Sequence, residues 1–226
     1  MATRRMVIVL LALGCCLGLV AQSHLAEGFT RLPAKSTITV MPLDVELFSL
    51  TAGGVTEPQA EWTAKATANL NEALRVREAG LGGRFLPLPS GEGELLAELK
   101  ALHGAVAQAI STHHFGGWKL PSKGGKLDWS LGEEVAEIQK QSGADYALFL
   151  YLRDSYATGG RVATMILYGA LGVGIGGGAQ VGYASLVDLR TGRIVWFNRM
   201  VKFTGDVREL EPAKGTLKNL LQEFPG

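Results

Sequence analysis

The hydrophobic residues of this chain follow two spacings, one of two positions and one of three to four, and each spacing predicts a type of element. Residues 36–42 alternate, with Ile38 and Val40 on one face, which predicts a β-strand that continues through residues 43–50. Pro42 has no backbone N–H to donate to a neighbouring strand. We therefore expect a strand end or a bulge at Pro42.

Three segments repeat apolar residues every three or four positions and predict amphipathic helices. The first begins at Pro58, because proline is favoured at the first helical position, where its missing N–H costs nothing. The second covers residues 94–112, and the third opens at Pro212. Their buried faces are expected to hold Trp62, Ala66, Leu70, Ala73 and Leu74, then Leu95, Leu99, Leu102, Val106 and Ile110, and finally Leu217, Leu220, Leu221 and Phe224.

A short helix and a central strand are expected after a glycine-rich loop at residues 115–128. Ser130 and Glu133 have the Ser-x-x-Glu spacing of a capping box, in which the two side chains bond each other's backbone N–H groups. The helix ends at Gly143, in the usual left-handed C-terminal position. Residues 144–152 are almost continuously apolar, as expected of a strand covered on both faces.

Late in the chain, further strands are expected at about residues 162–173, 180–189 and 193–203. Asp188, Thr191 and Gly192 suit a tight turn between the last two, because Gly192 supplies a positive φ and the Asp188 side chain bonds the turn backbone. An extended segment is also expected at residues 84–89. The whole pattern predicts an α/β (α+β) sandwich, with one mixed sheet of about five strands and helices packed on it.

Residues 162–187 contain seven glycines but no Asp, Glu, Lys, Arg or His, so they belong where water is scarce. We favour a hairpin buried in the sheet of a soluble protein. A transmembrane helix needs about 20 apolar residues, but each glycine costs a helix about 1 kcal/mol relative to alanine. The remaining alternative is a hairpin that enters an outer membrane, since each arm has the ~9–11 residues of a tilted spanning strand. Neighbouring subunits would then have to pair its edges.

The N-terminus has the pattern of an export signal. Arg4 and Arg5 precede an apolar run, and Ala21-Gln22-Ser23 supplies the small-x-small pattern of a signal-peptidase site. The expected organisation is a cleaved signal peptide at residues 1–23, an N-terminal extension at 24–35 and a single α/β envelope domain at 36–226.

Both cysteines, Cys15 and Cys16, lie in this leader. The mature domain would therefore have no thiol for a disulfide, a metal or a nucleophile. Ala12-Leu13-Gly14-Cys15 partly resembles a bacterial lipobox, in which a lipidated cysteine becomes the mature N-terminus, although the usual leucine is displaced. Cys15 and Cys16 are accordingly candidate lipidation sites.

Charge argues against a nucleic-acid partner. Without Arg4 and Arg5, the chain has 20 basic and 21 acidic side chains, so the mature net charge is near −1. A nucleic-acid-binding protein needs a cationic surface to neutralise phosphates, and the mature chain has no basic run. Attachment to anionic lipid through a polybasic segment is not indicated either.

No motif predicts a cofactor or a metal ion. Gly172, Gly174 and Gly177 match the Gly-x-Gly-x-x-Gly of dinucleotide sites, but the next residues do not open a helix and no acidic residue follows at the required distance. A flexible connection between strands is favoured. His113 and His114 are adjacent, so their side chains diverge, and they lack partners at ligand spacing. We expect a solvated helix end there.

Catalytic residues are not predicted either. Ser155 and Ser185 lie outside any Gly-x-Ser-x-Gly elbow, which leaves a serine hydrolase without its anchor motif. Glu133 and Glu134 are adjacent carboxylates at a helix start, where the helix dipole favours negative charge, so a capping role is expected.

The four tryptophans divide into two pairs. Trp62 and Trp196 lie in apolar patterns and are expected in the core. Trp118 and Trp129 flank the glycine-rich loop and are candidates for contact with a partner.

Three segments together resemble a group of exported bacterial proteins. They are the strand Thr-Ile-Thr-Val-Met-Pro42, the segment Gly143-Ala-Asp-Tyr-Ala-Leu-Phe-Leu150, and Ala184-Ser-Leu-Val-Asp188-Leu-Arg-Thr-Gly192-Arg-Ile-Val-Trp196. The group is that of envelope proteins related to the curli-secretion channel lipoproteins and the N-terminal domain of the Tol-system protein TolB. The resemblance covers about residues 36–224 and implies an α/β sandwich with a non-catalytic role in envelope assembly or secretion. The chain departs from the curli channels in lacking a clear lipobox and in having one uncharged hairpin where they insert two.

The sequence thus predicts a non-enzymatic protein of the periplasm or outer membrane that acts as an interaction or assembly module. We expect an envelope protein partner, with membrane association and self-association as further expectations, and no cofactor. Two alternatives stay open: a membrane-inserting oligomeric subunit of a secretion channel, and a periplasmic hydrolase without a recognisable motif.

Overall fold

The computed structural model describes residues 24–88 and 93–226. The expected signal peptide and both candidate lipidation sites, Cys15 and Cys16, lie outside the described residues. The described strands are β1 Thr37–Val40, β2 Asp44–Leu50, β3 Thr56–Pro58, β4 Arg84–Leu86, β5 Tyr146–Ala157, β6 Gln180–Asp188 and β7 Ile194–Lys202. The α-helices are α1 Ala60–Arg77, α2 Glu94–Ile110, α3 Ala136–Ser142, α4 Gly159–Ala170 and α5 Leu210–Leu220.

A mixed sheet of seven strands is built around the long strand β5. Strands β1 and β2 run parallel to β5 along one of its edges, while β6 runs antiparallel along the other. The outer positions belong to β4 beside β1, β3 beside β2, and β7 beside β6. The predicted fold class is confirmed, with two more strands than the expected five.

The interruption between β1 and β2 falls at Pro42, where the sequence predicts a strand end or a bulge. Met41 still donates its backbone N–H to the Leu148 carbonyl at 3.0 Å, so the chain stays beside β5 across the break. The two short strands therefore act as one bent strand.

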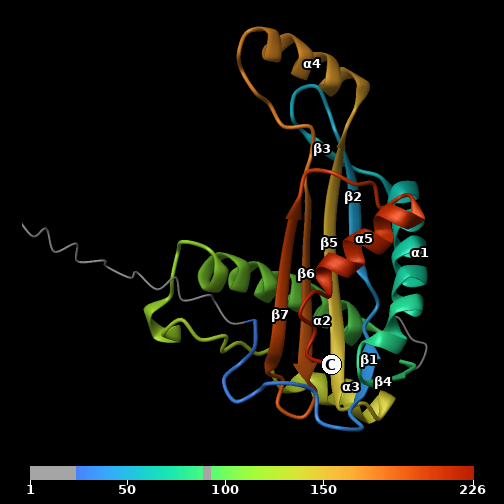
Figure 1. The fold of residues 1–226 in the computed structure, drawn as a ribbon, viewed down its shortest axis with the longest axis vertical. Coiled ribbons are helices and arrows are strands. Elements are labelled where there is room, and N and C mark those ends of the chain that lie inside the picture. The colour runs from blue at the N-terminus through green and yellow to red at the C-terminus, as the bar shows by residue number, and fades with distance from the viewer. Residues whose placement is uncertain (1–23, 89–92) are drawn as a thin grey trace, which may run out of the picture.

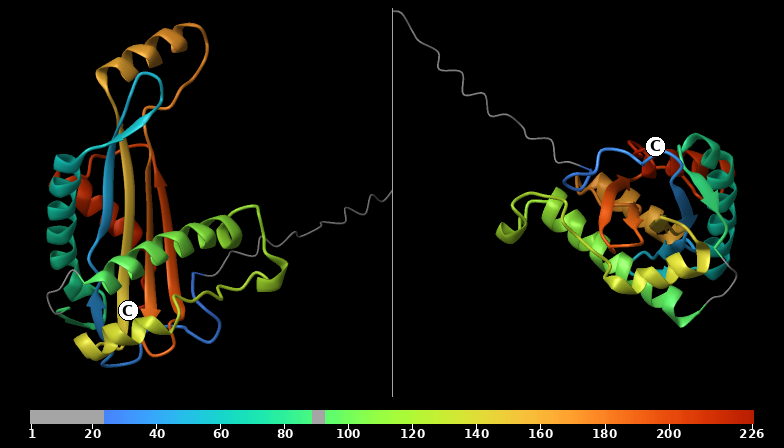
Figure 2. Two further views of the ribbon diagram at one scale, coloured as in Figure 1. Left: turned by 180° about the vertical axis from the view of Figure 1, so that it is seen from behind. Right: turned by 90° about the horizontal axis from the view of Figure 1, so that it is seen from below.

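Helices cover both faces of the sheet (Figures 1 and 2). Helices α1 and α5 pack against one face, around the fully buried Trp196. Helices α2 and α3 pack against the other face, around Phe149 and Phe197. Burying apolar surface on both faces is the main stabilising contribution to such a sandwich.

Two predicted helix starts are displaced. Pro58 is the last residue of β3, where it pairs with Phe48, and α1 begins after Gln59. Strand β3 is at the sheet edge, so the missing N–H of Pro58 costs no ladder bond there. Helix α5 begins at Leu210, and Pro212 lies in its first turn.

The predicted capping box does not form. Ser130 instead joins Arg193 in an isolated β-bridge. Its hydroxyl donates to the Gly192 carbonyl and accepts from the Gly132 N–H, both at 3.0 Å. The side chain is already used by the neighbouring turn, so a short 3₁₀ turn at Glu133–Val135 starts after Gly132 without a side-chain cap. Glu133 and Glu134 do lie in the first turn, as predicted, where negative charge is favoured by the helix dipole.

The predicted strand at residues 162–173 is wrong. Helix α4 occupies Gly159–Ala170 and projects beyond the end of the sheet (Figure 1). The buried hairpin does not form either, because only its second arm, β6, enters the sheet. Among the described residues, no helix combines the length and the apolar character needed to cross a membrane.

Candidate functional site

Helix α4 and the segment that returns from it to the sheet, together residues 159–179, form a projection that we call the tip. The Thr158 hydroxyl caps the helix by accepting the Arg161 N–H at 3.3 Å. At the other end, Gly172 has a φ of +78° and lets the chain turn back. Local capping therefore favours a helix where composition alone is ambiguous.

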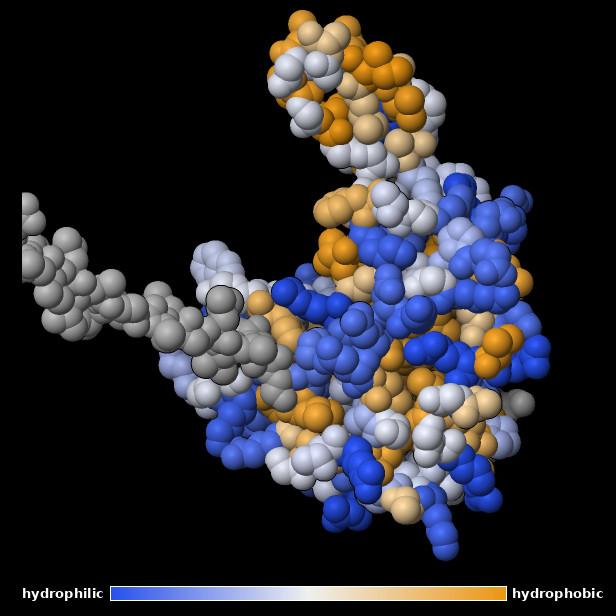
Figure 3. Space-filling view, viewed as in Figure 1, coloured by the Kyte–Doolittle hydropathy of each residue, from blue (hydrophilic) through white to orange (hydrophobic). Residues whose placement is uncertain are grey.

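The apolar side chains of the tip are exposed. No residue of α4 is buried, and the space-filling view shows the tip as a mainly hydrophobic lobe (Figure 3). A helix that is apolar on most of its surface is normally covered by protein or lipid. The exposed fractions are 44% for Val162, 70% for Ile166, 61% for Leu167, 44% for Tyr168, 71% for Leu171 and 48% for Val173.

The base of the tip is held by specific contacts. The Arg161 guanidinium donates to the Gly176 carbonyl through Nε at 3.0 Å and through Nη2 at 2.9 Å, which ties the helix to the return segment. Gly178 has a φ of +129°, and a Cβ at this position would lie 2.0 Å from the Ser155 carbonyl oxygen. Glycine is therefore required where the return segment closes onto β5. Arg161 is the only charged residue of the tip, and its guanidinium is already bound by these hydrogen bonds.

A buried polar chain lies in the sheet below the tip. The Asp154 carboxylate accepts from the Tyr156 hydroxyl and the Gln180 amide, both at 2.6 Å, and the Thr216 hydroxyl donates to Gln180 at 2.7 Å. Burial raises the pKa of Asp154, and burial together with Asp154 raises the pKa of Tyr156. The chain joins β5, β6 and α5, so it fixes the strands from which the tip emerges.

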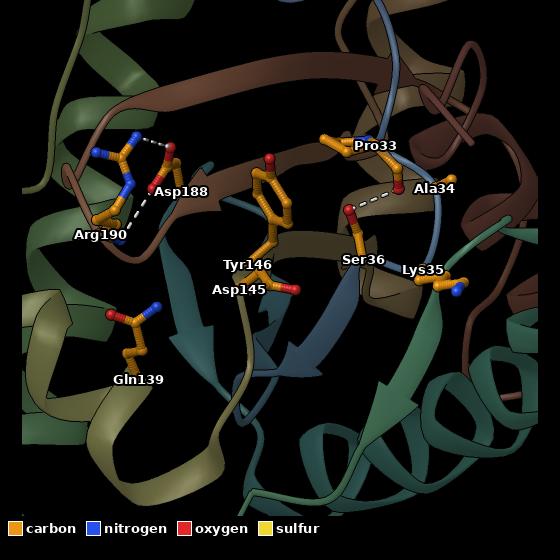
Figure 4. A pocket seen from close by; sticks show the side chains of 9 residues that line it. All are labelled: Pro33, Ala34, Lys35, Ser36, Gln139, Asp145, Tyr146, Asp188 and Arg190. Atoms are coloured by element: carbon orange, nitrogen blue, oxygen red, sulfur yellow. Dashed lines mark hydrogen bonds and ion pairs between the residues drawn. The ribbon is translucent and has the colours of Figure 1, made fainter.

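The opposite end of the sheet carries an open polar cavity of about 270 Å³ (Figure 4). The Asp145 carboxylate accepts from the Thr37 N–H and hydroxyl, both at 2.8 Å. Asp188 accepts the backbone N–H groups of Arg190 at 2.9 Å and Thr191 at 3.2 Å. These acids are occupied by backbone and turn contacts, so their arrangement serves the turns that line the cavity.

The turn after β6 brings two loops together. Gly192 has a φ of +72°, and its N–H donates to the Asp188 carbonyl at 2.8 Å. A Cβ on Gly192 would lie 2.0 Å from the Gly132 carbonyl oxygen. The turn therefore needs glycine both for its backbone angle and for this close approach.

A hydroxyl and an imidazole meet inside the core. His103 Nε2 lies 2.8 Å from the Ser185 hydroxyl, the spacing of a serine–histidine pair. However, His103 is 1% exposed and Ser185 0% exposed. No substrate can reach this pair, so it is a buried hydrogen bond between α2 and β6. Ser155, the other serine considered, exchanges hydrogen bonds with the backbone of Ala179.

The remaining predicted residues are dispersed. Trp118 is 79% exposed, whereas Trp129 is half-buried beneath Lys123, whose ammonium lies 4.9 Å from its ring centre. His113 is exposed, but His114 is buried, which corrects the expected solvated pair. His114 stacks edge-on against Phe115, so the helix end turns into the core.

The structure supports neither a dinucleotide site at the glycine motif nor a metal site among the described residues. Gly172 follows the C-terminal end of α4, and Gly174 and Gly177 lie in the return segment that leads into a strand, whereas a dinucleotide motif leads into a helix. Within residues 24–88 and 93–226, no group of three His, Cys, Asp or Glu side chains is arranged to hold a metal ion.

The two tryptophans expected in the core, Trp62 and Trp196, differ in burial. Trp196 is fully buried, as expected. Trp62 is partly exposed and packs against Tyr156 at 6.0 Å, with the Arg208 guanidinium 4.4 Å from its ring.

Sequence reasoning missed two features of this structure. It did not expect α4 to lie outside the sheet, although Thr158 is of a residue type that is favoured at the N-cap of a helix. It also did not expect the His103–Ser185 contact, because the two residues are 82 positions apart and nothing local joins them.

No family model matches the chain, and no curated protein matches it. Solved structures give weak likenesses. The LpoB C-terminal domain from Salmonella enterica is 16% identical with a TM-score of 0.31, and the match covers 79% of this chain and 88% of that one. Lipoprotein GNA1162 from Neisseria meningitidis is 16% identical with a TM-score of 0.34, and the match covers 82% of this chain and 91% of that one. The PelC dodecamer from Paraburkholderia phytofirmans is 15% identical with a TM-score of 0.37, and the match covers 87% of this chain and 91% of that one.

TM-scores and identities this low carry no functional argument. A specific relation to TolB or to the curli channels stays a prediction. The surfaces of this chain itself therefore have to indicate its function.

Proposed function

We propose that this chain is a non-enzymatic, exported envelope protein that acts as an assembly module and binds a protein partner through its tip. The observation that carries the proposal is the exposure of α4, whose large apolar side chains find no cover in the rest of the described chain. Exposed apolar patches of this kind mark interaction sites. The non-enzymatic role is supported by the burial of the one serine–histidine contact found among the described residues.

The geometry of α4 favours a groove on the partner. Ile166 follows Val162 by one helical turn and Leu171 follows Leu167 by one turn, so these exposed side chains cover about half of the helix circumference. Met165 lies near Gly177 of the return segment. A helix that presents such apolar anchors can be bound by a hydrophobic groove. We therefore infer that the partner is a protein with an apolar groove about as long as three helical turns.

Two observations favour protein over lipid as the cover. Helix α4 has 12 residues, or about 18 Å at 1.5 Å each, which is well short of the ~30 Å hydrocarbon core. Within the described chain, residues 174–178 donate no hydrogen bond from their backbone N–H groups. Unpaired peptide groups are costly in hydrocarbon, whereas a protein partner can bond them.

The flanking charge pattern supports the same choice. Helices that lie in a membrane surface carry lysine and arginine on their polar face. Helix α4 has Arg161 alone, and its guanidinium is bound to the Gly176 carbonyl.

The test compares a tip variant with a matched body variant of the full chain. Ile166→Ser/Leu171→Ser removes two tip side chains that are 70% and 71% exposed. Val55→Ser/Val76→Ser removes two body side chains that are 63% and 59% exposed. All four are exposed, so neither variant should change the melting temperature beyond the small effect of surface substitutions.

A photo-crosslinker at Leu167 identifies the partner in cells, and the purified pair is then titrated. Burying one such side chain contributes about 1.5–3 kcal/mol, so the tip variant should bind at least about tenfold more weakly while the body variant binds normally. An adduct between two copies would identify the partner as the chain itself. If the crosslinker captures no protein and the tip variant alone loses flotation with neutral vesicles, the tip is a lipid contact and the proposal is wrong.

A further inference from the structure

A second candidate site lies far from the tip, in the loop that follows α2. Residues 113–129 carry three lysines and one aspartate, a net charge of +2 in a chain whose total is only +1. In Figure 2 this loop extends beyond the end of α2, away from the sheet. It encloses a cavity of about 170 Å³ lined by His113, His114, Lys119, Leu120, Lys123, Gly125, Lys126 and Trp129.

No acidic side chain of the described residues lines this cavity. We propose that it binds a phosphate group, with Lys123 and Lys126 as the cationic contacts and Trp129 as an aromatic wall. A water molecule occupies about 30 Å³ of liquid, so 170 Å³ has room for a group of five heavy atoms such as a phosphate. The assignment is independent of the tip and of its partner.

The lysines are held by weak or replaceable partners. Lys126 pairs with Glu27 at 2.7 Å, and Lys123 lies 3.7 Å from Asp128 while donating to its carbonyl at 2.5 Å. The side chains of Glu27 and Asp128 are 69% and 67% exposed. Exposed ion pairs contribute little because solvent screens them, so a phosphate can displace these carboxylates. Lys119 bonds the His114 carbonyl and has a structural role.

Trp129 supplies the second observation, because its side chain forms part of the cavity wall beside the lysines. The Lys123 ammonium already lies over this ring, which keeps the charge beside the indole.

The donor set selects phosphate over carboxylate. Ammonium groups are point charges, whereas planar carboxylates are best matched by the fork of arginine, and no arginine of the described chain lines the cavity. A phosphate group offers about two negative charges and three acceptor oxygens to separate donors. Residues on two sides of the cavity can therefore share one phosphate.

The test titrates the full chain with glycerol 1-phosphate and, as a carboxylate control, with acetate, following tryptophan fluorescence at low salt. Lys123→Gln/Lys126→Gln should weaken phosphate binding about tenfold per lysine, because each substitution removes one charge-assisted hydrogen bond to the phosphate. Lys140→Gln/Lys218→Gln is the matched control, because Lys140 has an acidic partner as Lys126 does. It should leave binding unchanged.

Vesicles distinguish the two sources of phosphate. Binding to phosphatidylcholine vesicles that contain phosphatidic acid, lost in Lys123→Gln/Lys126→Gln, identifies a lipid headgroup. Saturable binding of glycerol 1-phosphate without vesicle binding identifies a soluble ligand. The inference is overturned if neither probe binds, if acetate binds as tightly as phosphate, or if the double variant binds as the control does. The tip variant Ile166→Ser/Leu171→Ser should bind phosphate normally, so failure here leaves the tip proposal intact.

Discussion

His103 should make the stability of this protein depend on pH. The side chain lies on α2 with 1% exposure, stacks against Phe149 at 4.9 Å, and has an Nδ1 without a partner in the described chain. Burial lowers the pKa of His103 to about 3. The imidazole is therefore neutral in the folded protein across the whole range in which an unfolded histidine takes up a proton.

The sign of the effect follows from proton binding. The unfolded chain binds a proton at His103 below pH 6.5, whereas the folded chain does not until about pH 3. The stabilising contribution is full above pH 6.5 and is lost as the pH falls toward 3. Each pH unit in this window costs about 1.4 kcal/mol, so lowering the pH from 7 to 5 should cost about 2 kcal/mol.

The assay is urea unfolding of the full chain at pH 7 and pH 5. Asp154 also titrates, and its raised pKa acts in the opposite direction, so the wild type alone does not isolate the histidine. The reference is His103→Leu/Ser185→Ala, in which both partners of the buried hydrogen bond become apolar and no donor is left unpaired.

The wild type should lose about 2 kcal/mol more than this double variant between pH 7 and pH 5. In a chain of this size, that corresponds to a melting temperature about 4–8 °C lower. Equal losses in the two proteins would refute the burial of a neutral His103.

Two glycines give further predictions. Gly192→Val should destabilise the protein by at least ~1–3 kcal/mol, because a β-branched residue is strained at positive φ and its Cβ would clash with the Gly132 carbonyl; an unchanged melting temperature would place the turn elsewhere. Gly178→Ala should force the return segment away from Ser155 and increase proteolysis within residues 171–179, whereas Gly174→Ala, which meets nothing within 4 Å, should not. Equal cleavage of the two alanine variants would contradict the tight closure of the tip.

Hydrophobic periodicity predicts the elements that bury one face at a regular spacing. The apolar stripes of α1 and α5, and the continuous apolar run of β5, are visible because each element buries a fixed face at a fixed spacing. The stripe predicted for α2 is partly wrong: Leu99 and Ile110 are buried, but Leu102 is 41% exposed, and the rest of the buried face is Leu96, His103 and Ala107. The break at Pro42 follows from the missing N–H of one residue. Periodicity was therefore sufficient to predict a mixed sheet covered by helices.

The conformation of residues 159–179 and the long-range contacts depend on how separate elements pack together in three dimensions. In this uncharged stretch valine favours a strand, leucine favours a helix and glycine favours neither, so composition does not choose between them. Strand β5 has edges for β1, β2 and β6 but no edge for a further strand. The capped segment beyond the sheet therefore became α4, with its apolar face left exposed. His103 meets Ser185, and Lys123 meets Trp129, only because packing brings separate elements together, and such contacts leave no periodic trace in the sequence.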